Sequence, residues 1–334
     1  MTAAATRAAA QRLAAVPGPF REIGDLKRVR VAHADGSAAQ RAFVRSWTAL
    51  VDGADPAQVA AAECAAAVAG ARLAGVDASV LRECGLSPDE ALAVLGRAVE
   101  EVAAGLHPHT VARLHAALPG LVAAPPHRLM ETCGGANGSG GSHMSPSGAE
   151  GPGAAAAPGF VGALCRQPRA GATAPGRPRL IVEPPENHAE HCWAVAVYGA
   201  LLADDVEADP ADAFLLGLAH HLHNAVLPDA GFAGEMLLGA HLESVVDRLT
   251  GRELATLPGA LAARIRELLA CRADAATPVG RAFHAADVLD RVLQCHHHAR
   301  AAGFTADQAL VDLELVHAGP VADYHHAVLA AAGL

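Results

Sequence analysis

The chain has 334 residues, of which 52% are hydrophobic and 18% charged, with a formal net charge of −10 and a pI near 6.0. This composition is typical of a folded protein with one large domain or two ordinary ones. An acidic chain offers no basic face to a nucleic-acid polymer or an anionic membrane, so we expect neither as a partner. A small anionic substrate stays compatible, because one metal ion and one or two arginines reverse the potential inside a pocket.

The predicted fold class is mainly α. Aromatic residues make up only 3% of the chain, and a core of Ala, Leu and Val favours helices over strands. The seven cysteines show no paired CxxC spacing, which predicts reduced thiols. The N-terminus has no apolar segment typical of secretion, and the longest apolar stretch, Cys192–Ala203, is shorter than the ~18–20 residues of a membrane span. We therefore expect a cytoplasmic protein.

Residues 1–130 are predicted to form a helical module, and they contain no motif of defined chemistry. Pro17-Gly18-Pro19 is expected to break an Ala-rich first helix. Ser37 is a predicted helix N-cap, and Ser87, followed by Pro88 and by Glu90 three residues on, resembles a capping box. The expected helices cover residues 1–16, 38–51, 55–73, 78–84, 87–106 and 109–118.

Residues 131–176 are rich in Gly, Ala, Pro and Ser and predict a flexible linker. Residues 138–144, Gly-Ser-Gly-Gly-Ser-His-Met, look like a fusion joint, although a natural Gly/Ser linker explains them equally well. The predicted organisation is two helical modules, 1–130 and 177–334, joined by this tether. A tether raises the effective concentration of the modules to ~mM, which favours their association with each other.

The second module contains 13 of the 19 histidines, which favours it as the location of any chemistry. Three of its apolar segments carry residues of metal-ligand type, namely Glu186–Cys192, Leu218–Asn224 and Phe283–Val292. Imidazole and carboxylate suit divalent ions such as Zn, Mn, Fe or Co. Convergence of the three segments predicts a metal site. The expected helices cover residues 188–204, 210–223, 239–250, 258–272, 279–302 and 306–332.

These segments resemble the HD-domain metal-dependent phosphohydrolases, in particular their 5′-deoxyribonucleotidase branch. That branch shows E-N-x-x-E-H-S opening a helix, then H-D followed by Glu and Asp, and later A-A-D-x-L. Here the first motif is Glu186-Asn187-His188-Ala189-Glu190-His191, the second begins at His220-His221, and the third is Ala285-Ala286-Asp287-Val288-Leu289. The resemblance runs from Glu186 to the C-terminus, implies an HD-domain helical fold for 177–334, and leaves residues 1–130 unassigned.

The resemblance implies that His191, His220 and Asp287 bind one divalent metal ion. His221 stands where the family has the aspartate of its H-D pair, and a histidine there can also bind the metal. Asn224 stands in place of the catalytic glutamate. An asparagine can hold a water molecule but cannot accept its proton near neutral pH.

Activation of water would then depend on the metal, which can lower the pKa of a bound water to ~7. Asp229, nine residues after His220 as in the family, is the remaining candidate for general acid or base. Arg177 or Arg179 lies roughly where the family keeps a phosphate-binding arginine.

The expected activity is hydrolysis of a small phosphomonoester, a nucleoside 5′-monophosphate by resemblance, with Fe, Mn, Co or Zn as the cofactor. The resemblance also implies a homodimer. One alternative is an HD-fold oxygenase with two irons, for which His223, His241 and His284 would supply additional ligands. The other is a degenerate HD module that serves binding or interaction, because positions 221 and 224 depart from the family.

Overall fold

The computed structural model describes residues 16–32, 34–123, 157–171, 173–174, 176–177, 179–181, 183–303, 305, 316 and 322–332. The predicted all-α fold is confirmed, since these residues form helices and contain no β-strand, only isolated bridges. Two compact units are present, residues 1–293 and residues 294–334. The second unit contains the last turns of α14 (Pro278–Ala302) and helix α15 (Ala322–Ala332).

The N-terminal half is helical as predicted. Ser37 caps α3 by accepting a hydrogen bond from Gln40 N, and the capping box of Ser87 and Glu90 opens α6. Helix α2 begins at Pro17, where we expected the chain to break; proline is favourable at the first helical position because it needs no N–H partner. Residues 1–15 of the expected first helix lie outside the described residues. The helices are α2 (Pro17–Asp25), α3 (Ala38–Val51), α4 (Pro56–Leu73), α5 (Ala78–Glu83), α6 (Pro88–Ala103) and α7 (Pro108–Ala123).

The prediction of a flexible linker over 131–176 was wrong for its C-terminal part. Helix α8 (Gly159–Arg166) lies there and buries Phe160, Val161, Leu164 and Cys165. These four side chains recur at helical spacing, so they form one apolar face despite the Gly- and Pro-rich surroundings. Residues 124–156, with the suspected fusion joint, lie outside the described residues.

The C-terminal half is arranged around α9 (His188–Leu202), every residue of which is buried. A helix that is apolar on all sides is stable only when other helices surround it. Helix α10 (Pro210–Ala219) packs against α9, and a Cβ on Gly217 would lie 2.3 Å from Ala196 Cα, so the two backbones are in direct contact there. The remaining elements of this half are η1 (Ala203–Val206), η2 (Leu222–Ala225), α11 (Gly231–Glu235), η3 (Met236–His241), α12 (Leu242–Leu254) and α13 (Gly259–Cys271).

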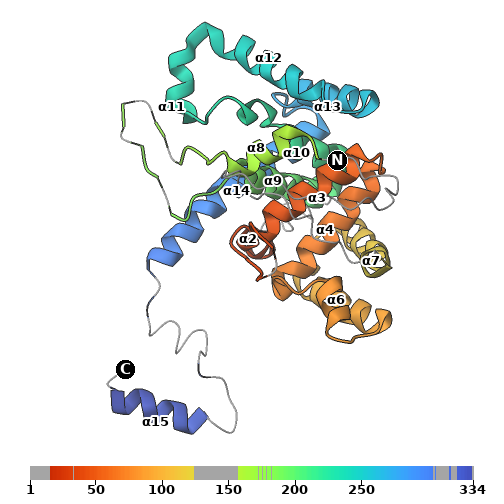
Figure 1. The fold of residues 1–334 in the computed structure, drawn as a ribbon, viewed down its shortest axis with the longest axis vertical. Helices are drawn as coiled ribbons and strands as arrows, with labels where there is room; N and C mark the ends of the chain where they lie inside the picture. Colours follow the sequence, from red (N-terminus) through yellow and green to blue (C-terminus); the bar gives the residue numbers. More distant parts are fainter. Residues whose placement is uncertain are drawn as a thin grey trace, which may run out of the picture. The chain divides into compact units, whose positions relative to one another are not determined.

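Helices from both halves share one core. Helices α3 and α4 pack against α9, α4 also packs against α10, and α3 packs against α8 (Figure 1). Phe20 of α2 stacks on Tyr198 of α9, and Trp47 of α3 meets Phe160 of α8 edge to face. Residues 1–293 thus form one packed unit. The domain boundaries at 130 and 177 stay a prediction, since a shared core is what two associated modules would also show.

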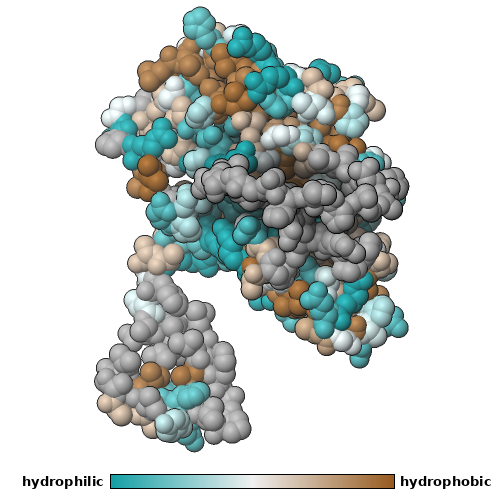
Figure 2. Space-filling model, in the orientation of Figure 1, coloured by the Kyte–Doolittle hydropathy of each residue, from teal (hydrophilic) through white to brown (hydrophobic). Residues whose placement is uncertain are grey.

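Apolar side chains are exposed on α11 and η3, which directly follow Asp229. Phe232, Met236 and Leu237 are each more than half exposed, and apolar residues gather over this part of the molecule at the top of Figure 2. Among the described helices, none combines the length and apolar character needed to cross a membrane.

Candidate metal centre

Helix α9 places His191 inside the core. Asn187 is its N-cap and accepts a hydrogen bond from Glu190 N, while the Glu190 carboxylate accepts one from Asn187 N. This capping box fixes the first turn of the helix. His191 follows directly and is completely buried.

His220 and His221 reach the same site because α10 ends at Ala219, directly before them. We expected a continuous helix over 210–223, in which adjacent side chains point 100° apart. The helix stops at Ala219, and His221 adopts a non-helical conformation. Both side chains therefore reach the cluster, in which one ligand atom from each of His191, His220 and His221 lies within 4.8 Å of the other two.

Helix α14 contributes two carboxylates one turn apart. Asp287 Oδ1 lies 3.5 Å from His191 Nε2, and its Oδ2 pairs with Arg291 at 2.9 Å. Asp290 Oδ2 accepts a hydrogen bond from the other ring nitrogen of His191, Nδ1, at 2.8 Å. Burial by itself raises the pKa of Asp287, but the neighbouring histidines and Arg291 lower it, so this carboxylate is ionised.

The hydrogen-bond partners assign the protonation of all three rings. Each Nδ1 faces an acceptor: Asp290 Oδ2 for His191, Gly217 O for His220 at 2.7 Å and Asn224 Oδ1 for His221 at 2.8 Å. Each Nδ1 therefore carries the proton, and each Nε2 presents a lone pair to the cluster. Burial lowers the pKa of His220 and His221, which keeps both rings neutral. Nε2 of His191 and Nε2 of His220 are 3.2 Å apart, an arrangement that a shared cation stabilises.

Arg169 also contacts the cluster, which the sequence did not predict. Its Nη1 donates to His221 Nε2 at 2.9 Å. The backbone brings it there, because Arg169 N bonds Glu186 O and His188 N bonds Gln167 O, which lays the segment after α8 beside the start of α9. Nothing in the local sequence distinguishes Arg169 from Arg177 or Arg179; its pairing with the segment at Glu186 is a tertiary feature.

Asp229 lies beside the cluster. Its carboxylate accepts backbone hydrogen bonds from Ala170 N at 2.9 Å and Gly231 N at 2.8 Å. Burial would raise its pKa, but these bonds and nearby Arg169 lower it. Asp229 Oδ2 is 3.6 Å from His188 Nε2, a buried atom without a hydrogen-bond partner. Burial and Arg169 lower the pKa of His188 to about 3, so its ring is neutral.

Asn224 has both polar atoms engaged. Its Oδ1 faces His221 Nδ1, and its Nδ2 donates to Leu227 O at 3.0 Å. The side chain thus orients His221. His223 is buried, with its ring centre 5.7 Å from that of His221, and does not belong to the three-histidine group.

The other predicted site residues lie elsewhere. Arg179 is an exposed residue that donates to the carbonyls of Ala170 and Ala230, and Arg177 is exposed. His241 and His284 are exposed as well. None of these four side chains has a described contact with the cluster.

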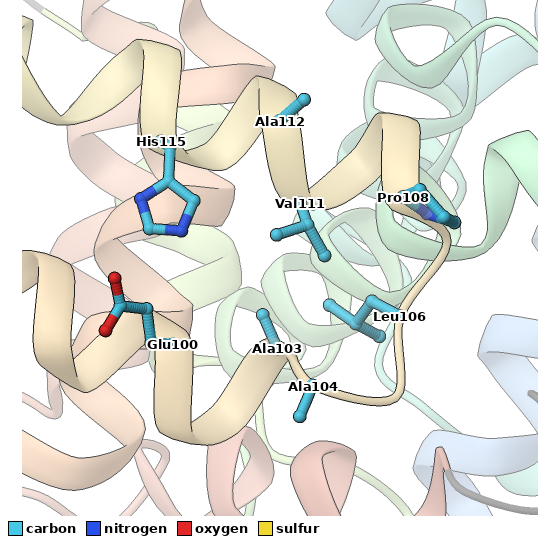
Figure 3. A pocket seen from close by; sticks show the side chains of 8 residues that line it. All are labelled: Glu100, Ala103, Ala104, Leu106, Pro108, Val111, Ala112 and His115. Atoms are coloured by element: carbon cyan, nitrogen blue, oxygen red, sulfur yellow. The ribbon is translucent and has the colours of Figure 1, made fainter.

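A surface cleft of about 500 Å³ lies apart from these residues, between α6 and α7. Glu100 and His115 point toward each other across it, and its other lining side chains are apolar (Figure 3). None of the predicted site residues lines this cleft.

Comparison with protein families identified one matching domain model. The family model of the HD domain matches residues 161–316, a range that begins in α8 and contains all four candidate ligands. Comparisons with curated proteins and with solved structures gave no significant match. Members of the HD-domain family bind divalent metals and include metal-dependent phosphohydrolases. Residues 161–316 of the chain therefore belong to the HD-domain family.

Proposed function

We propose that the protein is a metal-dependent phosphohydrolase that acts on a small phosphomonoester. His191, His220, His221 and Asp287 would hold one divalent cation. The observation that carries the proposal is the close approach of Nε2 of His191 and Nε2 of His220, 3.2 Å apart, with Asp287 Oδ1 3.5 Å from the former. Three imidazoles and one carboxylate are a donor set that suits Mn, Fe, Co or Zn.

When bound, a divalent cation supplies Lewis acidity, which polarises a phosphoryl oxygen and acidifies water. The chain's own residues supply the rest. His221 Nε2 accepts a hydrogen bond from the Arg169 guanidinium. When this nitrogen binds a cation, its lone pair no longer accepts that hydrogen bond. The guanidinium then becomes available to hold a phosphate group through paired hydrogen bonds.

Asp229 is the residue that would accept or return the proton. Its two backbone hydrogen bonds hold it in one orientation and keep it ionised. Its neighbour His188 has a buried lone pair at Nε2, so the pair offers two acceptors to the protons of one water molecule. Asn224 cannot replace the family's glutamate as a base, and its part is to orient His221.

The substrate class follows from the charge of the site and from the resemblance of the three motifs. Arg169 favours an anionic group next to the cation site. The motif at Glu186–His191 resembles that of 5′-deoxyribonucleotidases, and we therefore propose a nucleoside 5′-monophosphate as substrate.

No specific observation favours the two-iron alternative. Of its additional ligands, His241 and His284 are exposed, and the Arg169 guanidinium beside His221 opposes a second cation there. The alternative of a degenerate binding module differs from our proposal in its metal content: it predicts a folded protein that retains no metal.

The test is metal content followed by phosphate release. Wild-type protein loaded with Mn²⁺ or Co²⁺ should contain one equivalent and release phosphate from a panel of nucleoside 5′-monophosphates. Arg169→Gln should retain the metal and show KM raised at least ~10-fold, which corresponds to loss of one charged hydrogen bond of ~1.5–3 kcal/mol. Arg177→Gln is the matched control and should leave KM unchanged.

Two results would contradict the proposal. A metal-loaded, folded wild type that releases no phosphate from any phosphomonoester would exclude the activity. Full metal retention by both His220→Ala and Asp287→Ala would show that the cation lies elsewhere. Two irons per chain would select the oxygenase alternative.

A further inference from the structure

Lys27, the only lysine of the chain, lies buried in the N-terminal half, just after α2. It is 4% exposed, and its ammonium donates to Asp290 Oδ1 and Glu186 Oε1, each at 2.5 Å. Burial lowers the pKa of Lys27, but the two carboxylates outweigh this effect and the net pKa is raised. The buried residue is therefore an ammonium ion paired with two carboxylates of the C-terminal half.

Asp290 connects this ammonium to the candidate metal centre. One carboxylate oxygen faces Lys27, and the other accepts from His191 Nδ1 at 2.8 Å. A carboxylate that accepts from the outer nitrogen of a histidine fixes the tautomer and orientation with which the inner nitrogen meets a metal. Lys27 is therefore linked to the His191 ring through the Asp290 side chain and two hydrogen bonds.

The same part of the N-terminal half also holds the start of α9. Ser37 Oγ donates to Glu190 Oε1 at 2.6 Å, and Asn187 Nδ2 donates to Gln40 Oε1 at 3.0 Å. These contacts bind the capping box that precedes His191, but they do not involve its ring. These two contacts serve as a control for Lys27. They also connect the two halves, but they do not involve the hydrogen bonds from Lys27 through Asp290 to His191.

We infer that the N-terminal half is a component of the metal centre, and that Lys27 is a positioning residue acting through Asp290 on His191. The inference depends on the metal ligands named above, not on the reaction or its substrate. Without Lys27, the Asp290 carboxylate would lose both its counter-charge and the hydrogen bond that fixes its Oδ1. The imidazole would then lose the partner that holds its Nε2 toward the cluster.

The test is the affinity of the full-length protein for Co²⁺, measured by titration against a competing chelator. Lys27→Met and Asp290→Asn should each weaken binding by ~10–100-fold, the usual effect of removing a residue that supports a metal ligand. Because both residues act through one path, the double variant should bind Co²⁺ about as tightly as the single variant with the lower affinity. Lys27→Arg keeps the charge and should recover part of the affinity.

Ser37→Ala is the matched control. It removes a bond between the halves and an N-cap, so it should lower the free energy of unfolding while leaving the Co²⁺ affinity unchanged. Wild-type affinity in folded Lys27→Met and Asp290→Asn would overturn the inference. An equal loss of affinity in Ser37→Ala would also overturn it, since the effect would then be one of general stability.

A measurement on the wild type covers the case in which Lys27→Met fails to fold. Protein labelled with ¹⁵N at lysine gives one side-chain ammonium signal, because Lys27 is the only lysine. One equivalent of Zn²⁺ should shift this signal, and the shift should be absent in His191→Ala. A signal that stays in place while Zn²⁺ binds stoichiometrically, or a wild type that binds no metal, would overturn the inference. A wild type that binds metal but releases no phosphate would contradict only the proposed reaction.

Discussion

Asn224 Oδ1 accepts a hydrogen bond from His221 Nδ1 at 2.8 Å. The asparagine that stands in place of an expected catalytic glutamate is thus tied to the histidine that stands in place of an expected aspartate. The bond places the proton of His221 on Nδ1 and the lone pair on Nε2, where Arg169 donates to it. The two residues that differ from the expected pattern thus form one interacting pair, in which Asn224 orients the ring of His221.

Asn224→Ala should lower the affinity for Co²⁺ by ~10–100-fold, because His221 loses the acceptor that selects its tautomer. Asn224→Asp keeps an acceptor toward Nδ1 and should retain most of the affinity. Both variants lose the bond to Leu227 O, so their unfolding free energies allow the effect on the metal to be separated from stability. Equal affinities in the two variants would contradict the assignment.

Gly217→Ala should destabilise the protein by about 3 kcal/mol, because the new methyl group meets the backbone of α9 at Ala196 and a packed core does not accommodate it. Gly96→Ala in α6 is the control, since nothing lies within 4 Å of its added Cβ. It should stabilise by about 0.5–1 kcal/mol through helix propensity. Urea unfolding measures both. A Gly217→Ala protein as stable as wild type would contradict the close contact of α9 and α10.

The metal-free protein should lose stability as the pH falls from ~6.5 to ~4. Burial and Arg272 lower the pKa of His223 to about 4. In this window the unfolded chain binds a proton at His223 and the folded protein does not, so folding becomes less favourable by about 3 kcal/mol. His223→Gln should flatten this part of the curve. An unchanged slope, measured by urea unfolding with a chelator present, would show that His223 does not titrate in this way.

A thiol reagent should modify Cys84 and Cys295 in the native protein and spare Cys64 and Cys192. The first two are exposed, and the other two are buried. Burial also raises the pKa of both buried thiols, that of Cys64 to about 12, so the reactive thiolate does not form. Peptide mapping by mass spectrometry after brief labelling identifies the sites. Fast labelling of Cys192 would mean that α9 is accessible to solvent.

Much of the fold was predictable because its signals are local. Caps such as Ser37 and Ser87, and apolar residues at helical spacing, act over a few residues and appear directly in the sequence. The failures have physical causes as well. Helix α8 was missed because four apolar residues suffice for a short buried face. The helix expected over 210–223 was too long because its end at Ala219 depends on packing.

The sequence by itself determined most of the helices and the types of residue that could bind a metal, since His191, His220, His221 and Asp287 lie in or beside apolar segments. Only the tertiary structure decided what surrounds them. Lys27 is 263 residues from Asp290, and Arg169 is 52 residues from His221. No local pattern encodes such pairs, because they form only when packing of the core brings distant helix ends together.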